Sequence, residues 1–170
     1  MFFRSFVAAA IVTLVAAGPC VRDYIVKDGD ICDKISTAQG VSTYQLGVIN
    51  NGIIDNECSN LTPNLKICLG YLGEDCTTVY TVARGDTCEA IAAAHNVNVT
   101  LLHENNPQIN PGCGNIYIGE VLCVASKVIV PPPAVGKSFP MPSTAMPAVP
   151  SKTPQPVAND EEDLPWCDEL

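Results

Sequence analysis

Two stretches of this chain carry the same pattern: Cys20–Ile53 (CVRDYIVKDGDICDKISTAQGVSTYQLGVINNGI) and Cys76–Ile109 (CTTVYTVARGDTCEAIAAAHNVNVTLLHENNPQI). When the sequence is shifted by 56 residues, 12 of the 34 aligned positions hold the same residue. A one-residue gap then aligns Cys58 and Cys68 with Cys113 and Cys123 at an offset of 55. Each copy therefore has its own four cysteines. The repeat predicts two small domains rather than a solenoid.

Each copy is predicted to fold in the order β-α-α-β. Short stretches rich in β-formers, 24–27 and 80–82, are typical of strands. The Gly-Asp pair that follows favours a turn, and we expect Asp30 and Asp86 to be the N-caps of the first helices. The second helices are expected over 42–50 and 98–105, and the closing strands over 65–69 and 120–125. The predicted fold class is α+β, with the two strands of each copy paired antiparallel.

The cysteines indicate an oxidising compartment and domains held by disulfides. Nine cysteines in 170 residues divide into two sets of four and the single Cys167. No C-x-x-C spacing occurs, which disfavours a zinc ribbon or a redox motif. Four cysteines allow three pairings, and we expect the helix cysteine of each copy to reach the closing strand. The predicted bridges are Cys32–Cys68, Cys20–Cys58, Cys88–Cys123 and Cys76–Cys113, with none between domains.

The repeated motif resembles a known family. The pattern Y-x-V-x-x-G-D-[TI]-C-x-x-I, then L-x-x-x-N, then C-x9-C before an apolar strand, is similar to the LysM domain. With four cysteines per copy, residues 20–124 resemble the secreted fungal LysM effectors. The first copy departs from the second at Asn51, where Pro107 is the counterpart, and at Asn64, where Gly119 is. Because Asn tolerates a left-handed backbone, we expect the turn at Asn64 to be retained.

The resemblance implies a shallow groove that holds chitin or another N-acetylglucosamine oligomer. It would lie between the strand-to-helix turn and the segment after the second helix. An N-acetyl group offers one N–H, one C=O and a methyl, which exposed backbone groups and an aliphatic side chain can contact. The matching residues are Gly29, Asp30, Ile31, Asn50, Asn51, Gly52, Ile53 and Ile54 in the first copy, and Gly85, Asp86, Thr87, Asn106, Pro107, Gln108, Ile109 and Asn110 in the second.

A structural reading of the same residues stays open. The Gly-Asp pairs can serve only as turn and cap, and Ile53 and Ile109 only as core. If both loops do bind, Pro107 makes the second loop the stiffer one. We therefore expect Ile109→Asp to weaken binding more than Ile53→Asp.

Charge and motif content disfavour several other functions. Nine Lys and Arg against eighteen Asp and Glu give a net charge of −9, which disfavours nucleic acid or an anionic membrane as partner. The two histidines, His95 and His103, stand beside no nucleophile or metal-ligand cluster. Glu104 lacks the second carboxylate of a glycoside hydrolase. We expect no catalysis, metal or cofactor.

The two ends of the chain predict secretion and a non-globular tail. Arg4, an apolar run over 6–15 and small residues before a cut after Ala17 predict a signal peptide over 1–17. A linker is expected over 70–75 between domains at 20–69 and 76–124. The remaining 125–170 read as a disordered tail, Pro-rich and then acidic, since 131–157 holds nine of the fourteen prolines. Asn60 and Asn98 begin N-glycosylation sequons.

Together these patterns predict a secreted, non-enzymatic carbohydrate-binding protein. The resemblance implies chitin as partner, and a fungal role in shielding walls from hydrolases or withholding chitin fragments from a host's immune receptors. It also allows ligand-induced dimers or higher oligomers. The alternatives are a structural protein anchored in the cell wall and a binder of bacterial peptidoglycan.

Overall fold

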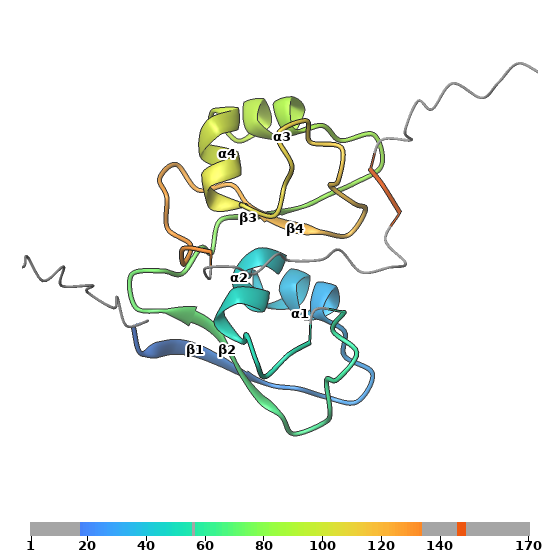
Figure 1. The fold of residues 1–170 in the computed structure, drawn as a ribbon, viewed down its shortest axis with the longest axis vertical. Helices are drawn as coiled ribbons and strands as arrows, with labels where there is room; N and C mark the ends of the chain where they lie inside the picture. The colour runs from blue at the N-terminus through green and yellow to red at the C-terminus, as the bar shows by residue number, and fades with distance from the viewer. Residues whose placement is uncertain (1–17, 56, 134–145, 149–170) are drawn as a thin grey trace, which may run out of the picture.

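Two β-α-α-β units make up the fold of the computed structural model, which describes residues 18–55, 57–133 and 146–148 (Figure 1). The expected signal peptide, Cys167 and the acidic end lie outside these residues. Both the α+β class and the order of elements are confirmed. Domain 1 contains β1 (Cys20–Ile25), α1 (Cys32–Gln39), α2 (Thr43–Ile49) and β2 (Lys66–Tyr71). Domain 2 contains β3 (Val79–Thr81), α3 (Cys88–Ala94), α4 (Val99–Asn105) and β4 (Val121–Cys123).

The strands of each domain pair antiparallel, and the two helices pack over them. Tyr24 lies opposite Ile67 in domain 1, and Tyr80 opposite Leu122 in domain 2. The buried side chains are those that the repeat places in register: Val26, Ile35, Leu46 and Ile67 in domain 1, and Val82, Ile91, Leu102 and Leu122 in domain 2. A domain of about fifty residues buries little apolar surface, so these small cores need disulfides.

The first helix of each domain begins one residue later than predicted, and neither Asp is its N-cap. The caps are Ile31 and Thr87, and the Thr87 hydroxyl accepts from the Ala90 N–H over 3.2 Å. Asp30 is turned back toward its strand, where Oδ2 accepts from the Lys27 N–H and the Tyr24 hydroxyl. Asp86 does the same in domain 2. The carboxylates therefore close the turn rather than cap the helix.

The predicted starts of the second helices are confirmed. Ser42 and Asn98 are N-caps whose side chains accept from the backbone N–H three residues on. The amide of Gln45, three residues after Ser42, turns inward and donates to the Leu69 carbonyl. Asn64 does hold the left-handed turn, with φ 71° against 94° for Gly119.

The predicted disulfide pairing is wrong in both domains. The bridges are Cys20–Cys68, Cys32–Cys58, Cys76–Cys123 and Cys88–Cys113. Antiparallel pairing places the first cysteine of each set beside the closing strand that holds the last one. The helix cysteine then faces the loop after the second helix instead. Among the described cysteines no bridge joins the domains, as predicted.

The domains pack directly against each other, with α1 and α2 facing β4 (Figure 1). The predicted linker over 70–75 begins inside β2, which runs to Tyr71. Tyr44 from α2 is buried with Cys76, Cys123 and Val130. The Thr43 hydroxyl accepts from the Val121 N–H over 3.0 Å. This junction contains apolar burial and hydrogen bonds, so the domains form one packed body.

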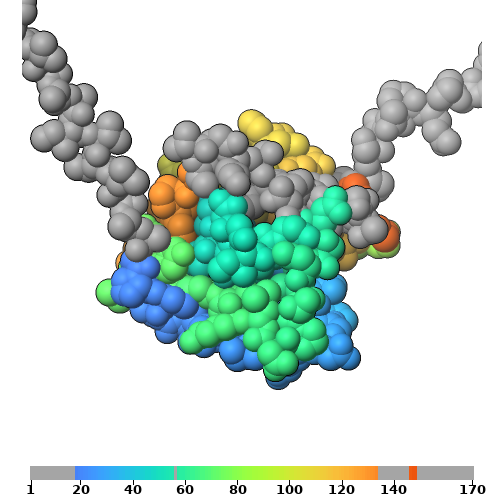
Figure 2. Space-filling view, turned by 60° about the horizontal axis from the view of Figure 1, so that its bottom comes forward, coloured from blue at the N-terminus to red at the C-terminus, as the bar shows by residue number. Residues whose placement is uncertain are grey.

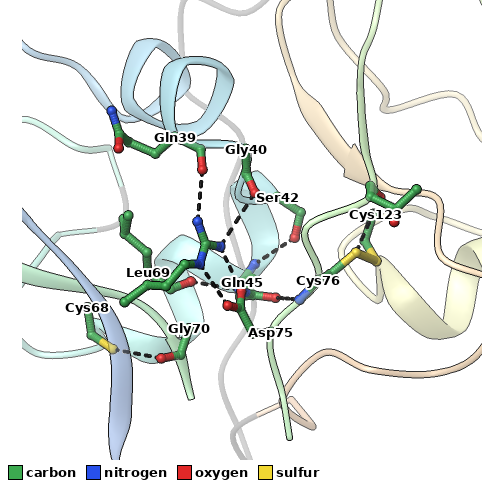
Figure 3. Close-up of polar contacts among 12 residues, drawn as sticks. Gln39, Gly40, Ser42, Gln45, Cys68, Leu69, Gly70, Asp75, Cys76 and Cys123 are labelled. Carbon is green, nitrogen blue, oxygen red and sulfur yellow. Dashed lines mark hydrogen bonds and ion pairs between the residues drawn. A yellow bond between two sulfur atoms is a disulfide. The ribbon is translucent and has the colours of Figure 1, made fainter. Parts of the chain in front are cut away.

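A polar network fastens the connection between the domains (Figure 3). Arg22 donates from Nε and Nη2 to the two carboxylate oxygens of Asp75, each over 2.7 Å, and from Nη1 to the Gln39 carbonyl. Gln45 donates to Asp75 and accepts from the Cys76 N–H over 2.8 Å. Burial raises the pKa of Asp75, but the hydrogen bonds from Arg22 and Gln45 outweigh it, and the net pKa is lowered. Asp75, the residue directly before domain 2, is thus held as an anion.

Two parts of the predicted tail pack on the domains. Residues 125–133 lie against α2, as the orange and teal atoms in Figure 2 show, and Tyr44 donates its hydroxyl to the Pro131 carbonyl over 3.0 Å. Residues 146–148 contact domain 2, and Ala148 belongs to its buried cluster. These segments correct the expectation of a wholly disordered tail. Within the described residues, no helix has the length and apolar character to cross a membrane.

Candidate functional site

The first half of the candidate site is the turn between the first strand and the first helix. Gly29 and Gly85 have φ of 76° and 88°, a left-handed conformation that costs a residue with a Cβ. The carboxylates of Asp30 and Asp86 hold this turn by accepting from a backbone N–H two residues beyond the strand and from a tyrosine hydroxyl within the strand. These two hydrogen bonds lower the pKa of Asp30, the backbone N–H of Lys27 contributing most. Asp30 is therefore an anion at neutral pH and shapes the turn of domain 1.

The second half is the loop after the second helix, which an asparagine braces in each domain. Asn60 accepts from the Asp55 N–H and donates to the Ile53 carbonyl, over 3.0 and 2.9 Å. Asn115 repeats both bonds with Asn110 and Gln108, each over 2.8 Å. This bracing role was not predicted from the sequence. The signal was present, because the two asparagines lie at the repeat's offset of 55.

In each domain, the disulfide with the smaller sequence separation connects these two loops. Cys32, next to Ile31, is bonded to Cys58, with 5.9 Å between their Cα atoms. Cys88, next to Thr87, is bonded to Cys113 across 6.0 Å. We call the turn and the braced loop of a domain its loop pair: residues 29–31 with 51–55 in domain 1, and 85–87 with 107–110 in domain 2. The structure thus brings together the two segments that the sequence proposed as one site.

The hydrogen bonds also change how the braced loop of domain 1 aligns with the braced loop of domain 2. Ile53 and Gln108 both present their carbonyl to the bracing asparagine, so they are equivalent. Ile54 and Ile109, 8% and 6% exposed, both lie in the core. The one-residue gap therefore falls before Ile53, and the pairing of Ile53 with Ile109 assumed from the sequence is wrong. Ile109→Asp would disturb the core of domain 2 and is unsuitable for testing the site.

The two loop pairs differ in their exposed side chains. In domain 1, Ile31 on the turn and Ile53 on the braced loop are 49% and 48% exposed. Their equivalents in domain 2 are the polar residues Thr87 and Gln108. Domain 1 therefore offers an apolar surface on both loops, whereas the equivalent side chains of domain 2 are polar, only partly exposed and turned to partners within the domain, Ala90 for Thr87 and Glu120 for Gln108.

Asn50 and Asn106, predicted to contact the ligand, are structural. Both are buried, and each donates to the carbonyls of its own helix and of its closing strand. Each also accepts from a cysteine N–H in that strand over 2.8 Å. These bonds occupy the polar groups of both side chains. The exposed members of the predicted set are Gly29, Ile31, Asn51, Gly52 and Ile53 in domain 1, and Gly85, Pro107 and Asn110 in domain 2.

A buried carboxyl lies under the loop pair of domain 2. Glu120 is 2% exposed, and its Oε1 accepts from the Gln108 amide over 3.0 Å. Burial raises its pKa to about 7, although the bonds from Gln108 and from the Tyr117 N–H oppose the shift. The loop pair of domain 2 therefore has a titratable group beneath it near neutral pH.

The described residues hold no group of three or more histidine, cysteine or acidic side chains that could bind a metal. His95 packs its ring edge-on against Tyr80, with 5.1 Å between the ring centroids, and belongs to neither loop pair. Besides the carboxylates of Asp30, Asp55 and Asp86, which accept hydrogen bonds within their own loops, the exposed surface of the loop pairs consists of backbone groups, aliphatic side chains and neutral polar groups. Such a surface is suited to binding a neutral polar ligand.

A family model described as the LysM domain matches residues 24–70 and 80–125, which is more than half of the chain. Among curated proteins, "Secreted LysM effector Vd5LysM" of Verticillium dahliae is 35% identical over 140 residues, or 81% of this chain and 18% of that protein. "Non-secreted LysM effector LCP1" of Gibberella moniliformis is 32% identical over 113 residues, or 65% and 15%. The chain therefore spans less than a fifth of the length of these two relatives.

Two further matches are a curated protein of which this chain covers about half, and a solved structure. "Secreted LysM effector LysM1" of Trichophyton rubrum is 26% identical over 131 residues, or 64% of this chain and 52% of that protein. The solved Bacillus megaterium spore cortex-lytic enzyme SleL matches with a TM-score of 0.32 and 20% identity, over 66% of this chain and 23% of that one.

Proposed function

Because the chain belongs to the LysM domain family, we propose that it is a secreted, non-catalytic protein that binds chitin or its oligomers. We further propose that the loop pair of domain 1 is its principal site. The observation that carries this proposal is the pair of exposed isoleucines, Ile31 and Ile53, placed one on each loop beside the turn at Gly29.

The groups at this loop pair match the chemistry of an N-acetylglucosamine unit. Its acetamide needs a hydrogen-bond donor and an acceptor, and its methyl and the faces of its sugar rings need apolar cover. Among the described residues the Gly29 N–H has no backbone partner, so it is available as a donor. Ile31 and Ile53 supply the apolar cover. Cys32–Cys58 limits the loss of loop entropy on binding, which favours affinity.

Charge favours chitin over peptidoglycan as the polymer. The chain carries a net charge of −9, and chitin is neutral, whereas peptidoglycan carries carboxylates. Repulsion between like charges would weaken binding to peptidoglycan at low salt. The test is a pull-down on the two insoluble polymers side by side, with depletion from the supernatant as the measurement. We expect depletion by chitin only.

Four disulfides and the secreted relatives support an extracellular location, in the culture fluid or bound to the cell wall. There the protein would shield wall chitin from hydrolases or withhold chitin fragments from a host's immune receptors. Fractionation of a producing culture separates this role from that of a structural wall protein. Recovery in culture fluid supports the first, and recovery only after wall extraction supports the second.

The site assignment is tested by calorimetry with N-acetylglucosamine oligomers. The double variant Ile31→Ser/Ile53→Ser should lower the affinity about tenfold or more, because it removes two apolar contacts worth about 1 kcal/mol each. The control is Ile25→Ser, an isoleucine that is 46% exposed on β1, outside both loop pairs. It should bind as the unaltered protein does. Equal affinities for the double variant and the control would contradict the site assignment.

A further inference from the structure

Residues 146–148 lie along residues 116–118 of domain 2, although they follow β4 in the sequence by more than twenty residues (the red segment in Figure 1). The Ile118 N–H donates to the Met146 carbonyl over 2.9 Å, and the Ala148 N–H donates to the Ile116 carbonyl over 3.0 Å. Tyr117 and Pro147 lie opposite each other as an antiparallel bridge. The segment thus adds a short strand to the α4–β4 connection.

The far end of this segment reaches the turn at Gly85, which belongs to the loop pair of domain 2. The Gly85 N–H donates to the Ala148 carbonyl over 2.9 Å. Ala148 is only 1% exposed, and it belongs to the buried cluster that includes Ile91, Ile109 and Ile116. One residue therefore bridges the turn at Gly85 and the α4–β4 connection.

The groups that Ala148 presents are those of an acetamide. Its N–H donates, its carbonyl accepts from the Gly85 turn, and its methyl is buried. An N-acetylglucosamine unit carries the same three groups. Domain 1 has no such occupant among the described residues, since the equivalent Gly29 N–H has no backbone partner there.

We propose that the segment Met146–Ala148 occupies the acetamide position of domain 2 as an internal competitor, so that domain 2 binds sugar only after this segment leaves. This inference rests on the proposed function and adds a regulation to it. The Gly85 N–H cannot donate fully to Ala148 and to a sugar at once. A tethered competitor acts at an effective concentration of about millimolar, enough to oppose a weak ligand. The apparent affinity of domain 2 is lowered in proportion to the fraction of molecules that are open.

The occupancy is tested first without any sugar, by amide hydrogen exchange in the full chain. In the unaltered protein the Gly85 amide should exchange at least about tenfold more slowly than the Gly29 amide, which has no such partner.

Ala148→Glu places a charge at a position that is 1% exposed, so it should release the segment and speed exchange at Gly85. Met146→Glu makes the same change at a side chain that is 56% exposed, and should leave exchange slow. Slow exchange retained at the Val82 amide, which donates to the Glu120 carbonyl within domain 2, shows that the variants are folded. Equally fast exchange at Gly29 and Gly85 in the unaltered protein would overturn the occupancy.

The competition is tested next with a chitin oligomer, in the Ile31→Ser/Ile53→Ser background that silences domain 1. Ala148→Glu should raise the affinity of this background about tenfold, and Met146→Glu should not. If Ala148→Glu speeds exchange at Gly85 but leaves oligomer binding unchanged, the segment is a structural strand and the proposal is wrong. If the unaltered protein binds no oligomer at all, the proposed function fails and the competition fails with it. The exchange experiment would then still report whether the segment is seated at Gly85.

Discussion

The hydroxyl of Tyr117 in domain 2 donates a hydrogen bond to Oδ1 of Asp33 in α1 of domain 1, over 3.1 Å. Thr43, also from domain 1, donates to the same oxygen over 3.4 Å and accepts from the Val121 N–H. The bonds lie where α1 and α2 meet β4. The relative orientation of the two loop pairs is therefore set by a polar and apolar junction and not by a loose linker.

The first prediction concerns this junction. Tyr117→Phe should lower the free energy of unfolding by about 1–2 kcal/mol at pH 7, because it leaves a partly buried carboxylate short of a donor. Burial already raises the pKa of Asp33, and loss of the Tyr117 bond should raise it further. A carboxyl whose pKa is raised on folding lowers the free energy of unfolding as pH rises. The decrease caused by Tyr117→Phe should therefore be larger at pH 7 than at pH 3. Urea unfolding at both pH values measures it.

Tyr71→Phe is the matched control, because it removes a hydroxyl that donates to the neutral Ile49 carbonyl within domain 1. Its cost should not change with pH. An equal, pH-independent loss in the two variants would contradict a role for Asp33 at the junction.

The second prediction concerns Glu120, whose pKa burial raises to about 7 from an ordinary 4.5. The unfolded chain loses this proton first, so the free energy of unfolding should fall as pH rises from about 4.5 to about 7. The slope is at most about 1.4 kcal/mol per pH unit. Glu120→Gln should remove most of this slope in urea titrations between pH 4 and 8, whereas the exposed Glu104→Gln should keep it. A slope that persists in Glu120→Gln would assign the pH dependence to other groups.

The third prediction separates the two kinds of disulfide. Cys32→Ser/Cys58→Ser frees the loops of domain 1 and should lower the affinity for chitin oligomers by roughly tenfold through loss of pre-organisation. Cys20→Ser/Cys68→Ser opens a longer loop, with a separation of 48 against 26. It should therefore lower thermal stability at least as much and change affinity less. Calorimetry and thermal unfolding give the two readouts. Equal losses of affinity would mean that Cys32–Cys58 does not pre-organise the site.

The fourth prediction concerns the two glycosylation sequons. Asn60 uses both ends of its side-chain amide in the loop, donating to Ile53 and accepting from Asp55. Asn98 uses only its oxygen, which caps α4, so its exposed nitrogen can carry a glycan while the cap remains. We expect mass spectrometry of the secreted protein to find higher occupancy at Asn98 than at Asn60. Asn60→Gln should cost stability even without a glycan, because it breaks the brace, and a neutral effect would argue against that brace.

Local signals in the sequence were sufficient for the elements of the fold. The starts of α2 and α4 follow from Ser42 and Asn98, whose side chains satisfy backbone N–H groups three residues on. The left-handed turn at Asn64 follows from the tolerance of Asn for that conformation. The two loops of the candidate site were implied by the resemblance of the repeated motif to the LysM domain. For the helix starts and the turn, the deciding contact or backbone conformation lies within a few residues of the chain, so the local sequence is enough to predict it.

The remaining features depend on segments that are distant in the sequence. Cys20 pairs with Cys68 because β1 and β2 run antiparallel, whereas spacing alone allowed three pairings. The loop alignment of Ile53 is decided by Asn60 and Asn115, and the occupant of the second loop pair by Ala148. Residue types near one position cannot specify which distant carbonyl or methyl fills the space beside it. Only the packing of the two domains and the returning segment decides that, because those contacts form between surfaces that the chain brings together on folding.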